Sequence, residues 1–286
     1  MSKAHPVISL SASPVSPGTF PEDIVLTATL TDAYPSVENQ TITFTINGSD
    51  YTAATNASGV ATYTLTQPAV DTYSIQASYA GDANNDTAAD SLSYDVNKGT
   101  QTSITVSGIA DEVIYSHSVY TLTPSGGSGT GDFSFAVQEN KEDVLTLDPA
   151  TGKITITGVG TAYVTVTKAA DDNYNEISEN VNITVTPKTL NATITVNDKI
   201  YDQTAAATAD SISYDGIVGS DAVSIAGGTL SFSDETAADD KSVSASGYTL
   251  SGAKSANYIL GTITVNHANI EKIALSITNT QVSDKE

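Results

Sequence analysis

Short runs in which β-branched or aromatic residues alternate with Thr and Ser recur along the whole chain, and they constrain its fold more than any other feature. Successive side chains of a β-strand point to opposite faces of a sheet, so this period of two is typical of half-buried strands. No segment shows a convincing amphipathic helical pattern. We therefore predict an all-β protein, with strands at 41–46, 73–79, 153–157, 162–167 and 181–185.

Turn-forming residues separate these runs. Asn47-Gly48 follows the run at 41–46, and a type I′ hairpin needs positive φ at both central residues, so we expect a hairpin there. The glycine-rich segment 125–131 lacks the Lys and the helix of a phosphate-binding loop. We interpret it as a flexible connection between strands and assign it no ligand.

The length of 286 residues predicts two or three domains, at roughly 100 residues per sandwich domain. Polar connectors near 97–99 and 187–188 divide the chain into three units, which we place at 1–97, 98–186 and 187–273. Because short connectors limit the angles between neighbours, we expect an elongated, end-to-end array.

The last segment, 274–286, repeats the pattern that opens the third unit. Its two ends, 275–278 and 283–286, correspond to 190–195 and 197–200 in the earlier copy. We expect it to be the start of a further repeat or a C-terminal tail, and we expect the natural protein to carry more repeats.

Composition excludes several classes of function. The 33 acidic and 11 basic residues give a formal net charge of -22, which repels nucleic acid. No apolar stretch is long enough to span a membrane, so we predict no membrane insertion. The absence of cysteine excludes disulfides and thiolate chemistry but does not exclude secretion. Residues 1–6 show no signal-peptide pattern, so we expect the signal and the anchor to lie outside this sequence.

Catalysis has little support. Only His5, His117 and His267 can serve as the base of a Ser-His-Asp arrangement, and we expect His117 to alternate with Tyr115 and Val119 along one face of a strand. With so many acidic residues, carboxylate pairs at glycosidase spacing arise by chance, and the chain has no Trp to stack on sugars. We predict that it is not an enzyme and needs no cofactor.

Calcium is the most serious site hypothesis. Two short segments, 82–86 and 171–176, gather oxygen ligands, and we take Asp82, Asp86, Asp171 and Asp172 as the candidate calcium ligands. The spacing matches no EF-hand, and turns made by Asp and Asn side chains explain both segments without an ion. The two explanations stay open.

The first unit resembles the bacterial Ig-like repeats of surface proteins, through SPVSPGT at 13–19, VLTATL at 25–30 and ASYAGDAN at 77–84. That family usually has an aromatic residue soon after the Gly-Asp-x-Asn turn, whereas this chain has Asn85 and Asp86. The second unit resembles another bacterial Ig-like family, through LDPATGKI at 147–154, GVGTA at 158–162 and DNY at 172–174.

The third unit resembles the YDG repeat of haemagglutinin-like and other large bacterial surface proteins, through KIYDQT at 199–204, GSD at 219–221, LSGA at 250–253 and ANY at 256–258. Gln203 replaces the usual Gly. These resemblances imply three tandem immunoglobulin-like β-sandwich domains outside the cell, without catalytic residues. We interpret Tyr174, Tyr201 and Tyr258 as corner residues that bury the ring while the hydroxyl reaches backbone.

Our leading hypothesis is a monomeric stalk or spacer of a bacterial cell-surface or secreted adhesin-like protein. The alternative is an adhesion module that binds an unknown host or cell-surface glycan or protein with its loops or a domain junction. Many bacterial surface domains carry a Lys–Asn isopeptide bond, and Lys and Asn residues in strand-like runs, such as Lys153 and Asn182, are candidates for one.

Overall fold

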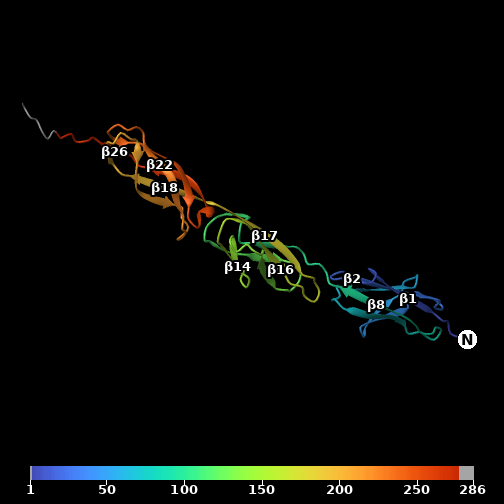
Figure 1. Ribbon diagram of the computed structural model, residues 1–286. Coiled ribbons are helices and arrows are strands. Elements are labelled where there is room, and N and C mark those ends of the chain that lie inside the picture. Colours follow the sequence, from blue (N-terminus) through green and yellow to red (C-terminus); the bar gives the residue numbers. More distant parts are fainter. Residues whose placement is uncertain (1, 277–286) are drawn as a thin grey trace, which may run out of the picture. The chain divides into compact units, whose positions relative to one another are not determined.

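The computed structural model describes residues 2–276, and the all-β prediction is confirmed (Figure 1). Within this range the one helical segment is a 3-10 turn, η1 (Ser255–Asn257). No helix in the described part is long and apolar enough to cross a membrane. The five strands expected from alternation are all present, as β4 (Thr41–Ile46), β7 (Thr72–Tyr79), β15 (Lys153–Ile156), β16 (Gly160–Lys168) and β17 (Ile177–Thr186).

The described chain divides into two compact units. Unit 1 contains the residues up to Val106 together with Pro124–Ser134 and Val166–Glu179. Unit 2 contains Ser107–Thr123, Phe135–Thr165 and the residues from Asn180 onward. The three-domain boundaries at 1–97, 98–186 and 187–273 stay a prediction, and 277–286 of the expected last segment lie outside the described residues.

Unit 1 contains the first sandwich, which is made of a three-stranded and a five-stranded sheet in the orders β1-β3-β6 and β2-β8-β7-β4-β5. Its other strands are β1 (Val7–Ser13), β2 (Gly18–Thr19), β3 (Ile24–Thr31), β5 (Ser49–Ala54), β6 (Val60–Leu65) and β8 (Ala88–Asn97). β2 pairs with β8 in parallel, and the other pairs are antiparallel. This order is typical of an immunoglobulin-like sandwich.

Alternating side chains of the two sheets form the core of the first sandwich. Leu26 of β3 and Phe44 of β4 are completely buried, and burial of each such side chain contributes about 1.5–3 kcal/mol. The predicted hairpin is confirmed, because Asn47 and Gly48 join β4 to β5 with φ of 44° and 84°. At the start of β7 the Tyr73 hydroxyl donates to the carbonyl of Ala69 at 3.0 Å, an arrangement called a tyrosine corner.

The middle strands form sheets in the orders β10-β17-β16-β13, β11-β15-β14 and β12-β9. Those not yet placed are β9 (Ile104–Ser107), β10 (Glu112–Ile114), β11 (Val119–Thr121), β12 (Thr123–Gly126), β13 (Phe133–Val137) and β14 (Leu145–Asp148). The expectation that Tyr115 and His117 share one strand with Val119 is wrong, because β10 ends at Ile114 and the two residues lie in the connection to β11. The glycine-rich segment connects β12 to β13, as expected.

The C-terminal sandwich of unit 2 has three three-stranded sheets in the orders β21-β18-β25, β19-β26-β23 and β20-β22-β24. Its core includes Ile194, Phe232 and Ile270. β18 pairs with β25 in parallel. The strands are β18 (Lys188–Val196), β19 (Lys199–Ile200), β20 (Ala206–Ala207), β21 (Ala209–Asp215), β22 (Ser224–Phe232), β23 (Ala238–Lys241), β24 (Val243–Ser251), β25 (Tyr258–Val265) and β26 (Ala268–Glu271).

Candidate functional site

A buried carboxylate in unit 2 joins segments that are far apart in the sequence. Asp221 lies in the loop between β21 and β22, and its side chain is only 4% exposed. Its Oδ2 accepts hydrogen bonds from the hydroxyls of Tyr115 at 2.8 Å and Tyr258 at 2.6 Å. The two rings meet edge to face, with centroids 5.6 Å apart. We call these three residues the tyrosine cluster.

Neighbouring groups complete the cluster. The Val218 N–H donates to the Tyr258 hydroxyl at 2.9 Å, which confirms the prediction that this hydroxyl reaches backbone. His117 Nε2 lies 3.0 Å from the Tyr115 hydroxyl and 3.5 Å from Asp221 Oδ1. Nearby, the Asn257 side-chain oxygen accepts the N–H of Val159 at 3.1 Å. The segments 219–221 and 256–258 therefore contact residues that precede β18.

The electrostatics of the cluster favour neutral tyrosines. Burial, followed by the hydrogen bond to Asp221, raises the pKa of Tyr115 to about 12 and that of Tyr258 to about 12. Within 2–276 every buried side-chain nitrogen and oxygen has a hydrogen-bond partner. The cluster is therefore internally satisfied, as expected of buried polar groups.

In unit 1, the turn at 171–175 is built around one carboxylate. Asp171 Oδ1 accepts the backbone N–H groups of Asn173 at 2.9 Å and Tyr174 at 2.8 Å. Its Oδ2 accepts the N–H of Thr130, which fixes the glycine-rich segment to the same turn. These hydrogen bonds, that of Thr130 foremost, lower the pKa of Asp171 to about 2.

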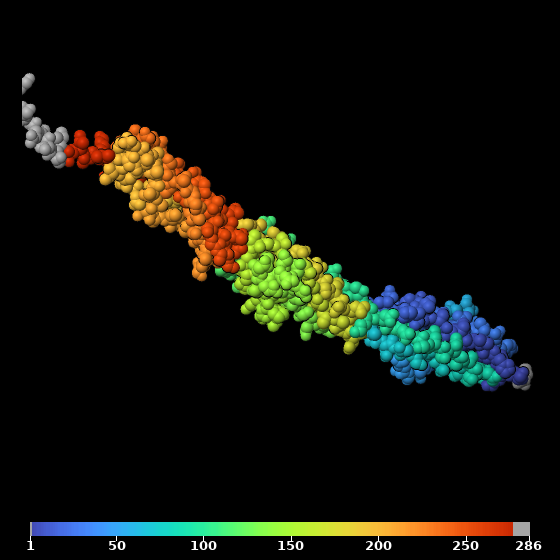
Figure 2. Space-filling model, viewed as in Figure 1, coloured from blue at the N-terminus to red at the C-terminus, as the bar shows by residue number. Residues whose placement is uncertain are grey.

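The connector that follows the first sandwich lies along this turn. The Gly99 N–H donates to the Asn173 carbonyl at 2.9 Å, and the Asn175 N–H donates to the Gly99 carbonyl at 2.9 Å. Lys98 Nζ donates to the Asp171 carbonyl at 2.6 Å. Figure 2 shows the two segments in contact, in teal near 98 and in yellow near 175.

The 171–175 turn also contacts the first sandwich directly. Asn173 Oδ1 accepts the N–H of Val70 at 3.0 Å. The half-buried ring of Tyr174 packs edge to face on Phe20, with centroids 5.1 Å apart. Gly99 has no room for a side chain, because a Cβ there would overlap the Phe20 carbonyl oxygen. Backbone, amide and aromatic contacts thus join the turn to the end of the sandwich.

The candidate calcium ligands lie in turns. Asp82 Oδ1 accepts the N–H groups of Asn84 and Asn85, and Asp86 Oδ2 lies 2.8 Å from His5 Nδ1. Asp171 makes the corresponding turn, and Asp172 is exposed. Among residues 2–276, no three His, Asp or Glu side chains are grouped to hold a metal. The calcium site at these four aspartates remains a hypothesis, and turn formation accounts for the roles of Asp82 and Asp171.

Acid should weaken the 171–175 turn. The pKa of Asp171 falls from 3.8 to about 2 on folding, so its stabilising effect is present above about pH 4 and is lost as the pH falls towards 2. We expect the melting temperature of Asp171→Asn to depend less on pH in this range than that of the wild type. Asp172→Asn, at the exposed neighbour, is the control. Identical acid profiles for the two variants would contradict this assignment.

The other sequence candidates do not converge on a reaction centre. His267 Nδ1 lies 3.0 Å from the exposed Asp240, and His5 pairs with Asp86. Lys153 of β15 and Asn182 of β17 are both exposed and belong to different sheets, each alternating with core residues. This geometry does not favour an isopeptide bond between them.

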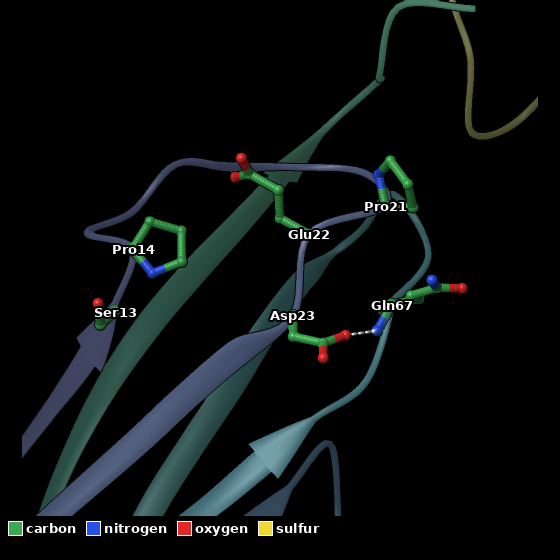
Figure 3. A pocket seen from close by; sticks show the side chains of 6 residues that line it. All are labelled: Ser13, Pro14, Pro21, Glu22, Asp23 and Gln67. Carbon is green, nitrogen blue, oxygen red and sulfur yellow. Dashed lines mark hydrogen bonds between the residues drawn. The ribbon is translucent and has the colours of Figure 1, made fainter. Parts of the chain in front are cut away.

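One surface hollow of about 540 Å³ lies on the first sandwich (Figure 3). The Gln67 N–H donates to Asp23 Oδ1 at 2.9 Å, while Glu22 points in another direction. The carboxylates therefore do not form a pair across the hollow. Its lining residues are Ser13, Pro14, Pro21, Glu22, Asp23 and Gln67.

Two family models match the sequence. Residues 10–97 match the bacterial Ig-like domain (group 3), and residues 186–265 match the YDG domain. The chain carries a bacterial Ig-like domain and a YDG domain. This domain content, typical of adhesin-like bacterial surface proteins, confirms the resemblances stated from 13–84 and 199–258. The tyrosine cluster thus draws two members, Asp221 and Tyr258, from the YDG domain.

Solved structures with some likeness include the bacterial proteins intimin and invasin. A C-terminal fragment of intimin in complex with the translocated intimin receptor (Tir) intimin-binding domain is 17% identical, with a TM-score of 0.28, and the match covers 63% of this chain and 65% of that one. Invasin, a bacterial integrin-binding protein, is 20% identical with a TM-score of 0.42, and the match covers 85% of this chain and 55% of invasin. Among curated proteins, none matches the sequence.

Sequence reasoning found some of these residues and missed others. It singled out Tyr174, Tyr258 and the segment 219–221, but it did not pair Asp221 with Tyr115. The signal for Asp221 was its place in a YDG motif. Nothing local to Tyr115 distinguishes it from the other tyrosines in strand-rich segments.

Proposed function

We propose that this chain is a non-catalytic spacer of a bacterial surface protein, in which specific hydrogen bonds and aromatic contacts fix neighbouring domains to one another. In this proposal the domains span 1–97, 98–186 and 187–273, and the chain acts as a monomer outside the cell. The observation that carries the proposal is the tyrosine cluster. Its buried carboxylate, Asp221, accepts one hydrogen bond from Tyr115, which precedes the boundary at 186–187, and one from Tyr258, which follows it. A flexible junction has no need of such a contact.

The boundary at 97–98 supports the same function by different means. There the connector pairs with the 171–175 turn, and the turn contacts Val70 and Phe20 of the first sandwich. These contacts fix the residues on the two sides of the boundary and so reduce bending at the linker. A spacer needs this stiffness in order to hold a distal domain at a distance.

Gly99→Ala tests this proposal. The new Cβ would overlap the Phe20 carbonyl oxygen, so the connector or the sandwich must move. We expect hydrogen exchange at the Val70 amide, which is bonded to Asn173, to become about tenfold faster or more, measured by NMR. Thr100→Ala, at the exposed next residue, should leave it unchanged. Fast Val70 exchange in Thr100→Ala as well as in Gly99→Ala would argue against a fixed junction.

The alternative is a binding module, and one observation favours it. Tyr51 of β5 is 37% exposed and stacks on Tyr63 of β6, with ring centroids 4.5 Å apart. An exposed aromatic pair can stack on a sugar or insert into a protein partner. Glycan-array binding that is lost in Tyr51→Ala and kept in Tyr34→Ala would favour this role.

A further inference from the structure

The 82–86 turn of the first sandwich repeats the hydrogen bonds of the 171–175 turn. The Asp82 N–H donates to the Asn85 carbonyl at 3.1 Å, as the Asp171 N–H does to the Tyr174 carbonyl at 3.1 Å. Asp82 Oδ1 also accepts the N–H groups of Asn84 at 2.6 Å and Asn85 at 2.8 Å. The two carboxylates therefore organise their turns in the same way.

Residues 3 and 4 occupy the place that 98 and 99 take at the other turn. The Ala4 N–H donates to the Asn84 carbonyl at 2.8 Å, and the Asp86 N–H donates to the Ala4 carbonyl at 2.9 Å. Lys3 Nζ donates to the Asp82 carbonyl at 2.8 Å, as Lys98 does to Asp171. The connector geometry is thus present twice in unit 1.

The side chains of the 82–86 turn suit a contact beyond the sandwich. Asn84 is exposed, and it corresponds to Asn173, whose side chain accepts the Val70 N–H. Asn85 stands where the other turn has Tyr174, and its buried amide accepts the Tyr34 N–H and donates to the Tyr34 carbonyl, both at 2.8 Å. The Tyr34 residue held in this way is 65% exposed.

A hollow of about 400 Å³ lies beside these groups. Lys3, Ala4, Tyr34 and Asn84 line it, together with Ser2 and Ala83. An aromatic ring and an amide therefore border a concave surface at the turn, as the ring of Tyr174 and the amide of Asn173 border the contact with the first sandwich.

We propose that Lys3, Ala4, Tyr34 and Asn84 form a docking surface for the end of another Ig-like sandwich. The docked end corresponds to the one that carries Phe20 and Val70 here. The proposal rests on the proposed function and names the kind of partner that the spacer accepts. The proposal follows from the repeated turn. The 171–175 turn already contacts the end of a sandwich that carries Phe20 and Val70, and the 82–86 turn has the same backbone hydrogen bonds.

The residue at position 4 selects among partners. Gly99 admits the Phe20 carbonyl oxygen into the space of a Cβ, whereas Ala4 places a methyl group at the corresponding position. A partner with the same loop as the first sandwich would overlap this methyl group. The surface therefore favours a sandwich whose loop stands further from the connector, and Ala4→Gly should open it to a copy of the first sandwich.

The test adds a second copy of residues 2–97 in front of Lys3, so that Asn97 precedes Lys3 as it precedes Lys98 in the natural connector. The full chain is kept, and only the added copy is isotope-labelled by protein ligation. Hydrogen exchange of the Val70 amide in the added copy is measured in three versions. The downstream position 4 is Ala, Gly, or Gly combined with Asn84→Ala, which removes the proposed acceptor.

With Ala4→Gly we expect Val70 of the added copy to exchange at least about tenfold more slowly than with Ala4, and we expect Asn84→Ala to abolish the difference. No protection with Ala4→Gly would overturn the docking surface, and equal protection with Ala4 would overturn the selection by residue 4. A second sample, labelled in the original first sandwich, measures the natural junction. Loss of protection there would count against the proposed function itself.

Discussion

Tyr258→Ala is expected to lower the free energy of unfolding of the C-terminal sandwich by about 3–5 kcal/mol, the usual cost of removing a buried aromatic ring. The ring of Tyr258 is buried at the start of β25 and packs on Tyr115. Its hydroxyl donates to Asp221 and accepts the Val218 N–H, so the change removes one of the two hydroxyls that donate to Asp221 and leaves the Val218 N–H without this acceptor. Urea unfolding followed by circular dichroism measures the loss.

Ile259→Ala is the matched control. Ile259 follows Tyr258 in the same strand but is 53% exposed, so its truncation should cost less than about 1 kcal/mol. Tyr258→Phe keeps the ring and removes only the hydroxyl, and it should fall between the two. If Tyr258→Ala and Ile259→Ala destabilised the protein equally, the tyrosine cluster would not have the role given to it.

Alkaline pH should weaken the hydrogen bonds of the tyrosine cluster and lower the free energy of unfolding. The pKa values of Tyr115 and Tyr258 rise on folding from 10.0 to about 12, so their stabilising effect is complete below pH 10 and is lost as the pH rises towards 12. The rise of the pKa from 10.0 to about 12 corresponds to about 2–3 kcal/mol for one tyrosine. The two share one carboxylate, so their effects are not additive.

The measurement is the decrease in unfolding free energy between pH values below 10 and near 12, compared among variants. Tyr115→Phe should reduce this decrease, although its stability at neutral pH is also lower. Tyr34→Phe, at an exposed tyrosine, should keep the wild-type decrease. Tyr63, Tyr73, Tyr79 and Tyr94 also have raised pKa values, so only the difference between variants reports on the cluster. An unchanged decrease in Tyr115→Phe would contradict the assignment.

Local patterns predicted the strands because burial on one face of a sheet fixes a period of two. The run at 41–46 coincides with β4, and Asn47-Gly48 supplies the two positive φ angles of the hairpin. The same reasoning failed at His117. There alternation continues across a connection, where the Tyr115 hydroxyl donates to Asp221 and its backbone N–H donates to the Thr186 carbonyl of β17.

The contacts of the candidate site could not be read from the sequence, because they join distant residues. Tyr115 and Asp221 are 106 positions apart, and no local period records that distance. The missing aromatic after the Gly-Asp-x-Asn turn was visible in the sequence, but its reason was not. The Asn85 side-chain amide forms two hydrogen bonds with the backbone of Tyr34, and only folding brings these two residues together.

The most direct test of the spacer proposal is small-angle X-ray scattering of the whole chain, with and without calcium. Three sandwiches fixed end to end, each about 30 Å long from strands of eight to ten residues, predict a maximum dimension on the order of 100 Å. The proposal predicts this value in both conditions, with a narrow distribution of shapes. A compact particle, or a broad distribution that narrows when calcium is added, would contradict it.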